Sequence, residues 1–170
     1  WFCVHNLACA IKRDDWDKCD LRVRRNTTRI LDLLDEKNVK ATFFVLGWVA
    51  DRAPDLIQEV ERRGHEIGVH GYNHLLLTEI TPEEFDADLQ KALEALARAG
   101  VKTTPIGFRA PSFSMVNTTK DWALPILEKY GFRYDSSVFP VGFHPDYGIA
   151  NAPLIPYKIT DQLYEFPMSV

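Results

Sequence analysis

The sequence has no surplus of positive charge. Its 20 Lys and Arg residues are outnumbered by 24 Asp and Glu residues, which gives a formal net charge of -4 at pH 7. Proteins bind nucleic acid largely by neutralising phosphates with Lys and Arg, and no cluster of basic residues interleaved with aromatic ones occurs here. We therefore do not expect nucleic acid as a partner.

Long apolar runs are also missing. No run approaches the roughly 20 residues that a membrane-spanning helix requires, and the first residues lack the charged, apolar and small-residue order of a secretory signal. We expect a soluble segment without a transmembrane span, and the cytoplasm is its expected location. That location is an open expectation, because a targeting signal could precede Trp1 in a longer parent chain.

Cysteine is scarce as well, with Cys3, Cys9 and Cys19 as the only examples. Disulfide-stabilised secreted domains carry a dense and even set of cysteines, and three cysteines near one end do not form such a framework. Free thiols in a reducing compartment are the favoured interpretation. A bridge between Cys9 and Cys19 is the alternative.

What is present is the composition of a folded domain. Hydrophobic residues make up 46% of the chain and charged residues 26%, far from the composition of disordered proteins. We expect one domain over residues 1–170. We interpret it as truncated at both ends, because the chain begins at Trp1 and stops at Val170 within a new apolar segment, residues 164–168.

From about residue 26 onwards, short β-rich runs alternate with segments of helical periodicity. This alternation is typical of βα units around a parallel sheet and predicts an α/β fold. The expected strands cover residues 41–46, 66–69, 106–108 and 132–134. The expected helices begin near residues 26–28, after Pro54, after Thr81 and after Thr119, and residues 138–162 are expected to be irregular.

Two of these elements are predicted in more detail. Residues 41–46 form a continuous β-branched and aromatic run, which predicts a strand buried on both faces that ends at Gly47. Thr81, Pro82 and Glu84 match a capping box with proline in the first turn. The helix after Thr81 is therefore the most secure element of the prediction.

His70, Arg109 and Asp135 each lie just past the C-terminal end of an expected strand. In parallel α/β sheets and barrels these strand ends open on one face, where catalytic and ligand-binding groups are placed. We therefore expect the three side chains to be neighbours in space. This inference depends only on the strand assignments.

His70 and His74 are spaced so that both imidazoles can bind one cation. They stand four positions apart, on one side of a helical turn or of a curled loop. The spacing alone favours a pair of solvated or core histidines. The buried strand before them, together with Gly71, which allows the backbone to wrap around a site, favours a metal site instead.

Four motifs follow one another along the chain: ATFF at residues 41–44, GHEIGVHGYNH at 64–74, FRAPSF at 108–113 and YDSS at 134–137. Together they resemble the polysaccharide deacetylases of the NodB-homology group, in particular the branch associated with bacterial exopolysaccharide synthesis. The resemblance implies a distorted (β/α) barrel that is incomplete at both ends in this chain. It also implies a divalent metal, usually zinc, with cobalt and manganese as alternatives.

The resemblance also assigns roles at the site. In that family an Asp and two histidines bind the metal, and the histidines correspond to His70 and His74. Arg109 would orient the catalytic base, with a structural salt bridge as the alternative for this residue. Asp135 would line the groove and help to position a general-acid His.

Substrate contacts are assigned to three further residues. Backbone N–H groups near Ser112 and Phe113 would help to form the oxyanion site, and Tyr72 lies between the metal ligands, where it could touch substrate. For the rings of Tyr72 and Phe113, packing in the core or at the rim is the favoured interpretation, and a contact with a sugar is the alternative. Among the other histidines, His5 and His65 are expected to be structural, and His144 is a candidate groove residue.

Two family motifs are absent from the chain. The first, with the base Asp and the ligand Asp, would precede Trp1, and the last, with the general-acid His, would follow Val170. We do not accept Asp14, Asp15 or Asp17 as substitutes, because they lie in an expected polar loop rather than at a strand end. The segment alone is therefore expected to be inactive.

The leading functional hypothesis is metal-dependent hydrolysis of N-acetyl groups on the amino sugars of a polysaccharide, by metal-activated water. The alternative within the enzyme class is a hydrolase of a small cyclic amide or ureide on the same scaffold. A third hypothesis is a catalytically dead carbohydrate-binding domain. Activity on chitooligosaccharides as against small ureides would separate the first two.

Overall fold

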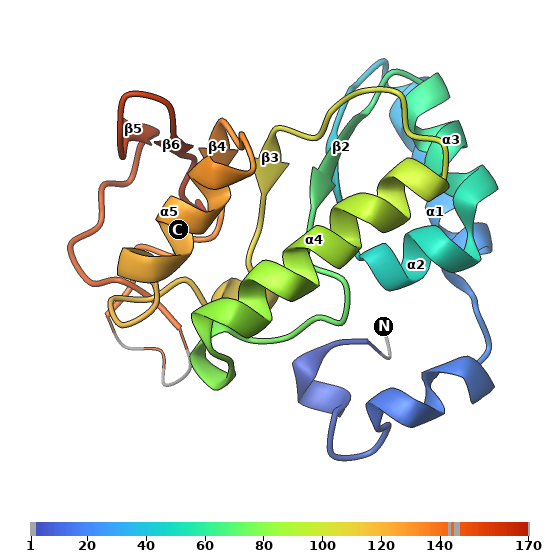
Figure 1. The fold of residues 1–170 in the computed structure, drawn as a ribbon. Coiled ribbons are helices and arrows are strands. Elements are labelled where there is room, and N and C mark those ends of the chain that lie inside the picture. Colours follow the sequence, from blue (N-terminus) through green and yellow to red (C-terminus); the bar gives the residue numbers. More distant parts are fainter. Residues whose placement is uncertain (1–2, 143, 145–146, 170) are drawn as a thin grey trace.

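The structure is a computed structural model that describes residues 3–142, 144 and 147–169. A six-stranded sheet in the order β1-β2-β3-β4-β6-β5 runs through it (Figure 1). All neighbouring strands are parallel except β5, which is antiparallel to β6. The strands are β1 (Thr42–Val45), β2 (Glu66–Val69), β3 (Gly107–Phe108), β4 (Tyr134–Asp135), β5 (Tyr157–Lys158) and β6 (Tyr164–Glu165).

Helices precede or follow most of these strands. The longest, α4, runs past β2 and β3 and packs against α2, while α3 packs against β2 (Figure 1). The α-helices of the described residues are α1 (Val23–Glu36), α2 (Gly47–Arg52), α3 (Pro54–Arg62), α4 (Pro82–Arg98) and α5 (Lys120–Lys129). Short 3-10 turns are η1 (His5–Leu7), η2 (Arg13–Lys18), η3 (Leu77–Glu79) and η4 (Pro111–Phe113).

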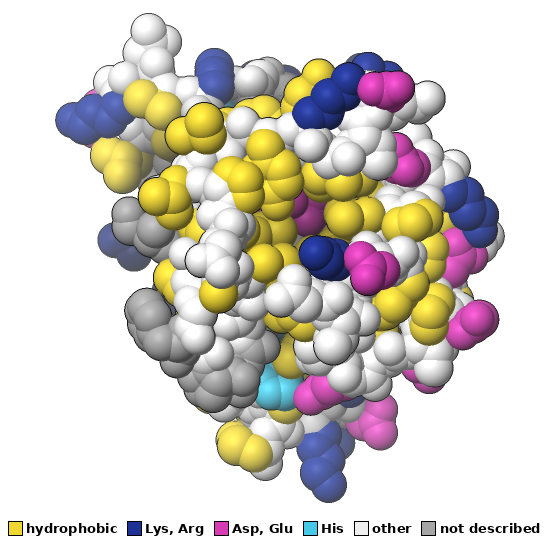
Figure 2. All heavy atoms as spheres, turned by 90° about the vertical axis from the view of Figure 1, so that its left-hand side faces the viewer, with side chains coloured by type: hydrophobic (Ala, Val, Ile, Leu, Met, Phe, Trp, Pro, Cys, Tyr) yellow, Lys and Arg dark blue, Asp and Glu magenta, His cyan; other side chains and the backbone are white. Residues whose placement is uncertain are grey.

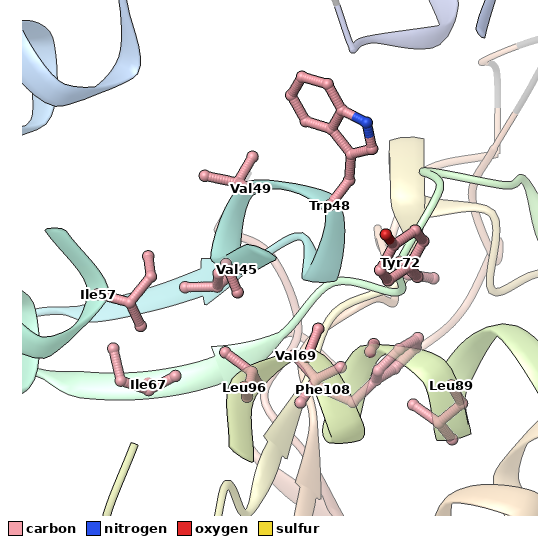
Figure 3. Packing of buried hydrophobic residues seen from close by; sticks show 14 of the residues in the cluster. Val45, Trp48, Val49, Ile57, Ile67, Val69, Tyr72, Leu89, Leu96 and Phe108 are labelled. Carbon is pink, nitrogen blue, oxygen red and sulfur yellow. The ribbon is translucent and has the colours of Figure 1, made fainter. Parts of the chain in front are cut away.

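The hydrophobic core lies between the sheet and α4. Leu89 and Leu96 of α4 are almost completely buried and lie near Val69 and Phe108 of the central strands (Figure 3). Burial of each large apolar side chain contributes roughly 1.5–3 kcal/mol to folding. This packing fixes the C-terminal ends of β2 and β3 with respect to α4, and His70 and Arg109 follow directly after these ends.

The most specific predictions of local structure are confirmed. Thr81 Oγ1 accepts a hydrogen bond from the Glu84 N–H at 3.2 Å, and Glu84 Oε2 accepts one from the Thr81 N–H at 2.8 Å. These two bonds form the expected capping box at the start of α4. The helix after Pro54 is also present, and Gly64 follows its end with a φ of +77°.

Other expectations were wrong in part. The strand at residues 41–46 is not buried on both faces, because Thr42 is exposed and Phe43 and Phe44 are only half-buried. Gly47 does more than end that strand: it begins α2, which was not predicted. The first helix starts at Val23, before the expected cap at residues 26–28, and the irregular stretch 138–162 contains β5.

The three cysteines are free thiols, so the alternative bridge between Cys9 and Cys19 does not form. Cys3 is buried, whereas Cys9 is exposed. Among the described residues, no helix combines the length and the apolar character needed to cross a membrane.

The capping box at α4 can be tested by mutation. Thr81→Ala is expected to lower the free energy of unfolding by about 1 kcal/mol, because the Glu84 N–H loses its acceptor. Thr81→Ser retains the hydroxyl and should remain close to the wild type. Chemical denaturation followed by circular dichroism measures both values, and an equal loss in the two variants would show that the hydroxyl does not stabilise α4.

Candidate metal centre

The loop after β2, residues 70–74, carries both expected metal ligands. The His70 N–H donates to the Val45 carbonyl at 3.0 Å, which continues the pairing of β1 with β2. Gly71 then turns the chain with a φ of +70°, and a Cβ at this position would lie 2.8 Å from Asp88 Oδ2. Any larger residue at position 71 would have to displace this carboxylate.

Asp88 of α4 holds the loop by its backbone. The buried Asp88 carboxylate accepts hydrogen bonds from the Tyr72 N–H at 2.7 Å, from the Asn73 N–H at 3.1 Å and from Asn73 Nδ2 at 3.0 Å. Asp88 was not predicted from the sequence to be part of the site. Its position beside Leu89, on the inward face of the helix, was the available signal. A carboxylate buried there requires hydrogen-bond donors, which indicates a nearby loop that supplies them.

The imidazole rings of His70 and His74 lie next to each other, with centroids 5.1 Å apart and planes at 74°. Two imidazoles that bind one tetrahedral zinc ion at about 2.0–2.1 Å have their centroids about 5.2 Å apart. His70 Nδ1 lies 2.7 Å from the Arg109 carbonyl oxygen. A carbonyl can only accept, so Nδ1 carries the proton and Nε2 keeps the lone pair that a cation would bind.

His74 is held in an uncommon backbone conformation, with a φ of +58°. Residues other than glycine adopt this region rarely, and they do so mostly where the surrounding structure requires it. The buried Nδ1 of His74 has no hydrogen-bond partner among the described atoms. Because burial of a polar nitrogen without a partner is costly, this ring has spare capacity for a ligand.

Burial lowers the pKa of both imidazoles to about 4. For His70, desolvation is the largest cause and the neighbouring His74 is the next, whereas the bond to the Arg109 carbonyl acts in the opposite direction. Desolvation is also the largest cause for His74. Both rings are therefore neutral at pH 7, which is the protonation state that metal binding requires.

His70, His74 and Arg109 line one cleft of about 460 Å³. Thus the structure brings together three of the residues singled out from the sequence. The described lining contains no Asp or Glu. The rest of the lining consists of Cys3, Val4, Val23, Thr27, Thr42, Phe43, Phe44, Val45, Leu46, Val49, Leu56, Ile57 and Val60.

Arg109 is held by Ser136 rather than by an acid. Its Nε donates to the Ser136 carbonyl at 2.8 Å, and its Nη2 donates to Ser136 Oγ at 2.6 Å. The guanidinium also lies over the Phe44 ring, 4.3 Å from the centroid. Burial lowers the pKa of Arg109, an effect that Asp135 opposes. Because both hydrogen bonds of the guanidinium go to Ser136 rather than to a described acid, the structural salt bridge is not supported.

Asp135 does not line this cleft, contrary to the expectation from the sequence. It is fully buried, and its Oδ1 accepts a hydrogen bond from Ser137 Oγ. Ser137 Oγ in turn accepts one from the Ala110 N–H at 2.7 Å. Asp135 therefore lies behind the site and is connected through one hydroxyl to the residue that follows Arg109.

Tyr72 also lies away from the cleft. Its side chain is buried, its hydroxyl donates to Asp51 Oδ2 at 2.9 Å, and the Lys91 ammonium lies 4.0 Å from the ring centroid. Asp51 belongs to α2 and Lys91 to α4, so the ring fills the space between these helices (Figure 3). The expected contact of Tyr72 with substrate is not supported, and core packing explains the residue.

Ser112 and Phe113 form a strained turn, with φ values of +49° and +55°. The Phe113 N–H already donates to the Ala110 carbonyl at 3.2 Å, so it is not free to bind an oxyanion. The Phe113 ring packs against Phe139 and Tyr147, with centroids 5.5 Å and 5.7 Å apart. Packing is thus the better account of Phe113, and the oxyanion role stays a prediction for the Ser112 N–H.

The other histidines lie outside the cleft lining. His65 is buried, and its Nδ1 accepts a hydrogen bond from the Ala41 N–H at 3.3 Å, which fits the expected structural role. His5 is exposed on η1. His144 stacks on Tyr147 with centroids 3.5 Å apart, and its role in a groove stays a prediction.

The early acidic residues do not supply a further ligand. Asp14, Asp15 and Asp17 lie on η2 rather than in the expected loop, and Asp17 pairs with Arg52 near the surface. Among the described residues, no group of three His, Cys, Asp or Glu side chains could hold a metal ion. The histidine pair therefore fits two positions of a metal site, one short of the three protein ligands usual in catalytic zinc sites.

The model of the family described as polysaccharide deacetylase matches residues 14–134. This span contains His70, His74 and Arg109, the residues that share the cleft. The chain therefore belongs to the polysaccharide deacetylase family.

Relatives and solved structures agree with this assignment. A peptidoglycan-N-acetylglucosamine deacetylase of Bacillus cereus is 37% identical over 98 residues, which cover 57% of this chain and 35% of the relative. A structure from Mycobacterium smegmatis assigned to the polysaccharide deacetylases is 37% identical with a TM-score of 0.66, over 84% of this chain and 45% of that one. A family 4 carbohydrate esterase from Streptomyces lividans in complex with acetate is 27% identical with a TM-score of 0.57, over 65% of this chain and 54% of that one.

These likenesses confirm the α/β fold expected for the family. The chain spans 35% to 54% of the length of the three proteins.

The role of Asp88 can be tested with an isosteric change. Asp88→Asn should reduce affinity for zinc about 10-fold to 100-fold, because an outer-shell partner of the ligand loop is lost. The free energy of unfolding should fall by about 1–3 kcal/mol, since one buried N–H loses its acceptor. Asp86→Asn on the same helix removes only a partner of Lys129 and serves as the control. Equal effects in calorimetric titrations of both variants would contradict the assigned role.

The lowered histidine pKa values predict an unusual titration. In the metal-free protein, NMR signals of His70 and His74 should titrate near pH 4, well below the ordinary value of 6.5. The unfolded chain takes up these protons near pH 6.5, so stability should be lost as pH falls from there towards 4. His70→Asn and His74→Asn assign the signals. Midpoints near 6.5 would show that the rings are not desolvated.

Proposed function

We propose that this chain contributes two metal ligands and an orienting arginine to a deacetylase that removes N-acetyl groups from the amino sugars of a polysaccharide. The observation that carries the proposal is the cleft shared by His70, His74 and Arg109, in which His70 Nε2 is left free as a ligand. The Bacillus cereus relative is a peptidoglycan-N-acetylglucosamine deacetylase, which supports an N-acetylated amino-sugar polymer as the substrate class.

Zinc is the proposed metal, with cobalt and manganese as alternatives, because neutral imidazole nitrogens suit such cations. When bound, the cation would lower the pKa of a water molecule to about 7 and polarise the acetamide carbonyl. His70 and His74 would hold the cation. Arg109 would orient a carboxylate base with its planar guanidinium. The described cleft lining contains no carboxylate, so neither the base nor a carboxylate as third ligand comes from the residues that line it.

Hydrolysis of a small ureide and sugar binding without turnover remain the alternatives to deacetylation. The exopolysaccharide branch and the cytoplasmic location also stay predictions, as does the extent of the domain over residues 1–170. Assays on chitooligosaccharides and on small ureides distinguish the two hydrolytic activities.

The proposal predicts a specific loss of metal and activity. In the full-length protein, His70→Asn and His74→Asn should each reduce zinc affinity by more than about 100-fold and abolish acetate release from an N-acetylated oligosaccharide. His65→Asn is the matched control, because its amide oxygen can still accept the Ala41 N–H bond. The 170-residue chain alone should be slower by at least about 100-fold, since none of its described residues places a carboxylate base in the cleft. Turnover in either ligand variant would overturn the metal assignment.

A further inference from the structure

Asp135 on β4 and Glu165 on β6 are two carboxyl groups buried side by side. They are paired in parallel register, and both residues are 0% exposed. Paired residues on neighbouring strands project to the same face of a sheet, so the two carboxyl groups lie close enough for the charge of Asp135 to act on Glu165. Yet Asp135 Oδ2 and Glu165 Oε2 have no donor among the described atoms if both groups are ionised.

One proton resolves this conflict. Two carboxylates in contact cannot both be charged in a buried site without a large cost. A proton on Glu165 Oε2 provides the donor that Asp135 Oδ2 lacks. Glu165 Oε1 still accepts hydrogen bonds from the N–H groups of Ser137 at 3.1 Å and Val138 at 3.0 Å. With the Ser137 hydroxyl on Asp135 Oδ1, every oxygen of the pair then has a partner.

The pair fixes the segment that holds Arg109. Residues 136–138 follow β4 directly, and Glu165 accepts the backbone N–H groups of two of them. Ser136, the remaining residue, accepts both hydrogen bonds of the Arg109 guanidinium. Ser136 Oγ also donates to the carbonyl of Phe166, the residue after Glu165, at 2.8 Å. The position of the arginine in the cleft therefore depends on β6.

We propose that Glu165 is a positioning residue that acts as a neutral carboxylic acid, donating its proton to Asp135 and thereby holding Ser136 and the Arg109 guanidinium in place. The catalytic significance of this arrangement rests on the proposed function. The shared proton and the position of Arg109 do not, and they can be measured without any assay of deacetylation.

The surroundings of the pair favour a retained proton. Burial, followed by the charge of Asp135, raises the pKa of Glu165 to about 10, and burial raises that of Asp135 to about 6. Glu165 lies under a cleft on the face of α5 and β5, where hydrophobic side chains gather (Figure 2). The charged or titratable groups around the pair are Arg109 after β3, Tyr134 on β4, Tyr157 and Lys158 on β5, and Lys120 and Asp121 of α5.

The test is the pH dependence of stability in the full-length protein. An unfolded Glu releases its proton near pH 4.5, whereas folded Glu165 keeps it to about pH 10, so the stability that Glu165 contributes should decline with rising pH across this range. The difference between the wild type and a Glu165 variant separates this contribution from the opposite one of His70 and His74. Glu165→Gln keeps the shape and a donor but cannot ionise. Its unfolding equilibrium should therefore shift in favour of the folded state, relative to the wild type, by up to about tenfold per pH unit.

Exposed Glu83 offers a control. The pH dependence of stability should be the same in Glu83→Gln as in the wild type. Carbon NMR of labelled glutamate carboxyl groups reports the proton directly, and the Glu165 signal should be that of a protonated acid at pH 7. Parallel pH slopes for the wild type and Glu165→Gln, or a Glu165 signal that titrates near pH 4.5, would overturn the proposal.

The positioning role has its own measurement. Hydrogen exchange of the Arg109 Nε–H should be slow in the wild type and in Glu165→Gln, because both hold residues 136–138. Glu165→Leu removes the acceptor and the donor together and should accelerate this exchange by about tenfold or more. Unchanged exchange in folded Glu165→Leu would refute the positioning role. If that variant does not fold, the pH slope of Glu165→Gln still decides whether the proton is shared.

Discussion

The hydrogen bond between His70 Nδ1 and the Arg109 carbonyl joins the two strand ends on which the candidate site is built. It depends on the register of β2 and β3, which the Arg109 N–H extends by donating to the Val69 carbonyl at 2.9 Å. The carbonyl of Arg109 fixes the tautomer of the His70 imidazole. The side chain of Arg109 enters the cleft that His70 and His74 line. One residue thus sets the direction of the free His70 nitrogen and supplies the positive charge beside it.

The rest of the histidine loop is held from two sides. On one side, the Asp88 carboxylate of α4 accepts hydrogen bonds from the N–H groups of residues 72 and 73. On the other side, the first N–H groups of α2 donate to the carbonyls of residues 71 and 72. Gly47 N–H donates to the Gly71 carbonyl at 2.9 Å, and Trp48 N–H donates to the Tyr72 carbonyl at 3.2 Å. Free N–H groups at a helix start require acceptors, and here the loop provides them. The packing of α2 on α4 therefore determines where His74 lies.

Local signals predicted a large part of this arrangement. The capping box of α4 needs only Thr81 and Glu84, which are close in sequence, and a buried strand that ends in a polar residue already indicates the open face of a parallel sheet. The cleft shared by His70 and Arg109 follows from such signals. The short helix α2 escaped prediction, because its start depends on acceptors supplied by residues 71 and 72.

The positions that sequence reasoning missed depend on partners far along the chain. Glu165 was noticed only as part of an apolar segment, since its partner Asp135 lies 30 positions earlier and the pairing requires β6 to lie beside β4. Asp88 looks like an ordinary helix residue until the loop at residues 71–73 is placed against it. Tyr72 stands between the two histidines in sequence, but the turn at Gly71 directs its ring to the helices instead of the cleft.

Burial acts on the two sides of Arg109 to set the charge of the site. On the cleft side, desolvation keeps His70 and His74 neutral, so Arg109 is the only charged side chain of the described lining. A divalent cation that entered would meet one positive charge, and two unit charges 4 Å apart interact by about 4 kcal/mol at an effective dielectric constant of 20. Behind the arginine, Asp135 supplies the opposing charge, which counteracts the lowering of the Arg109 pKa by burial. With Glu165 neutral, the pair carries a single negative charge, on Asp135, which faces the guanidinium across Ser136. This negative charge offsets part of the repulsion between Arg109 and the cation.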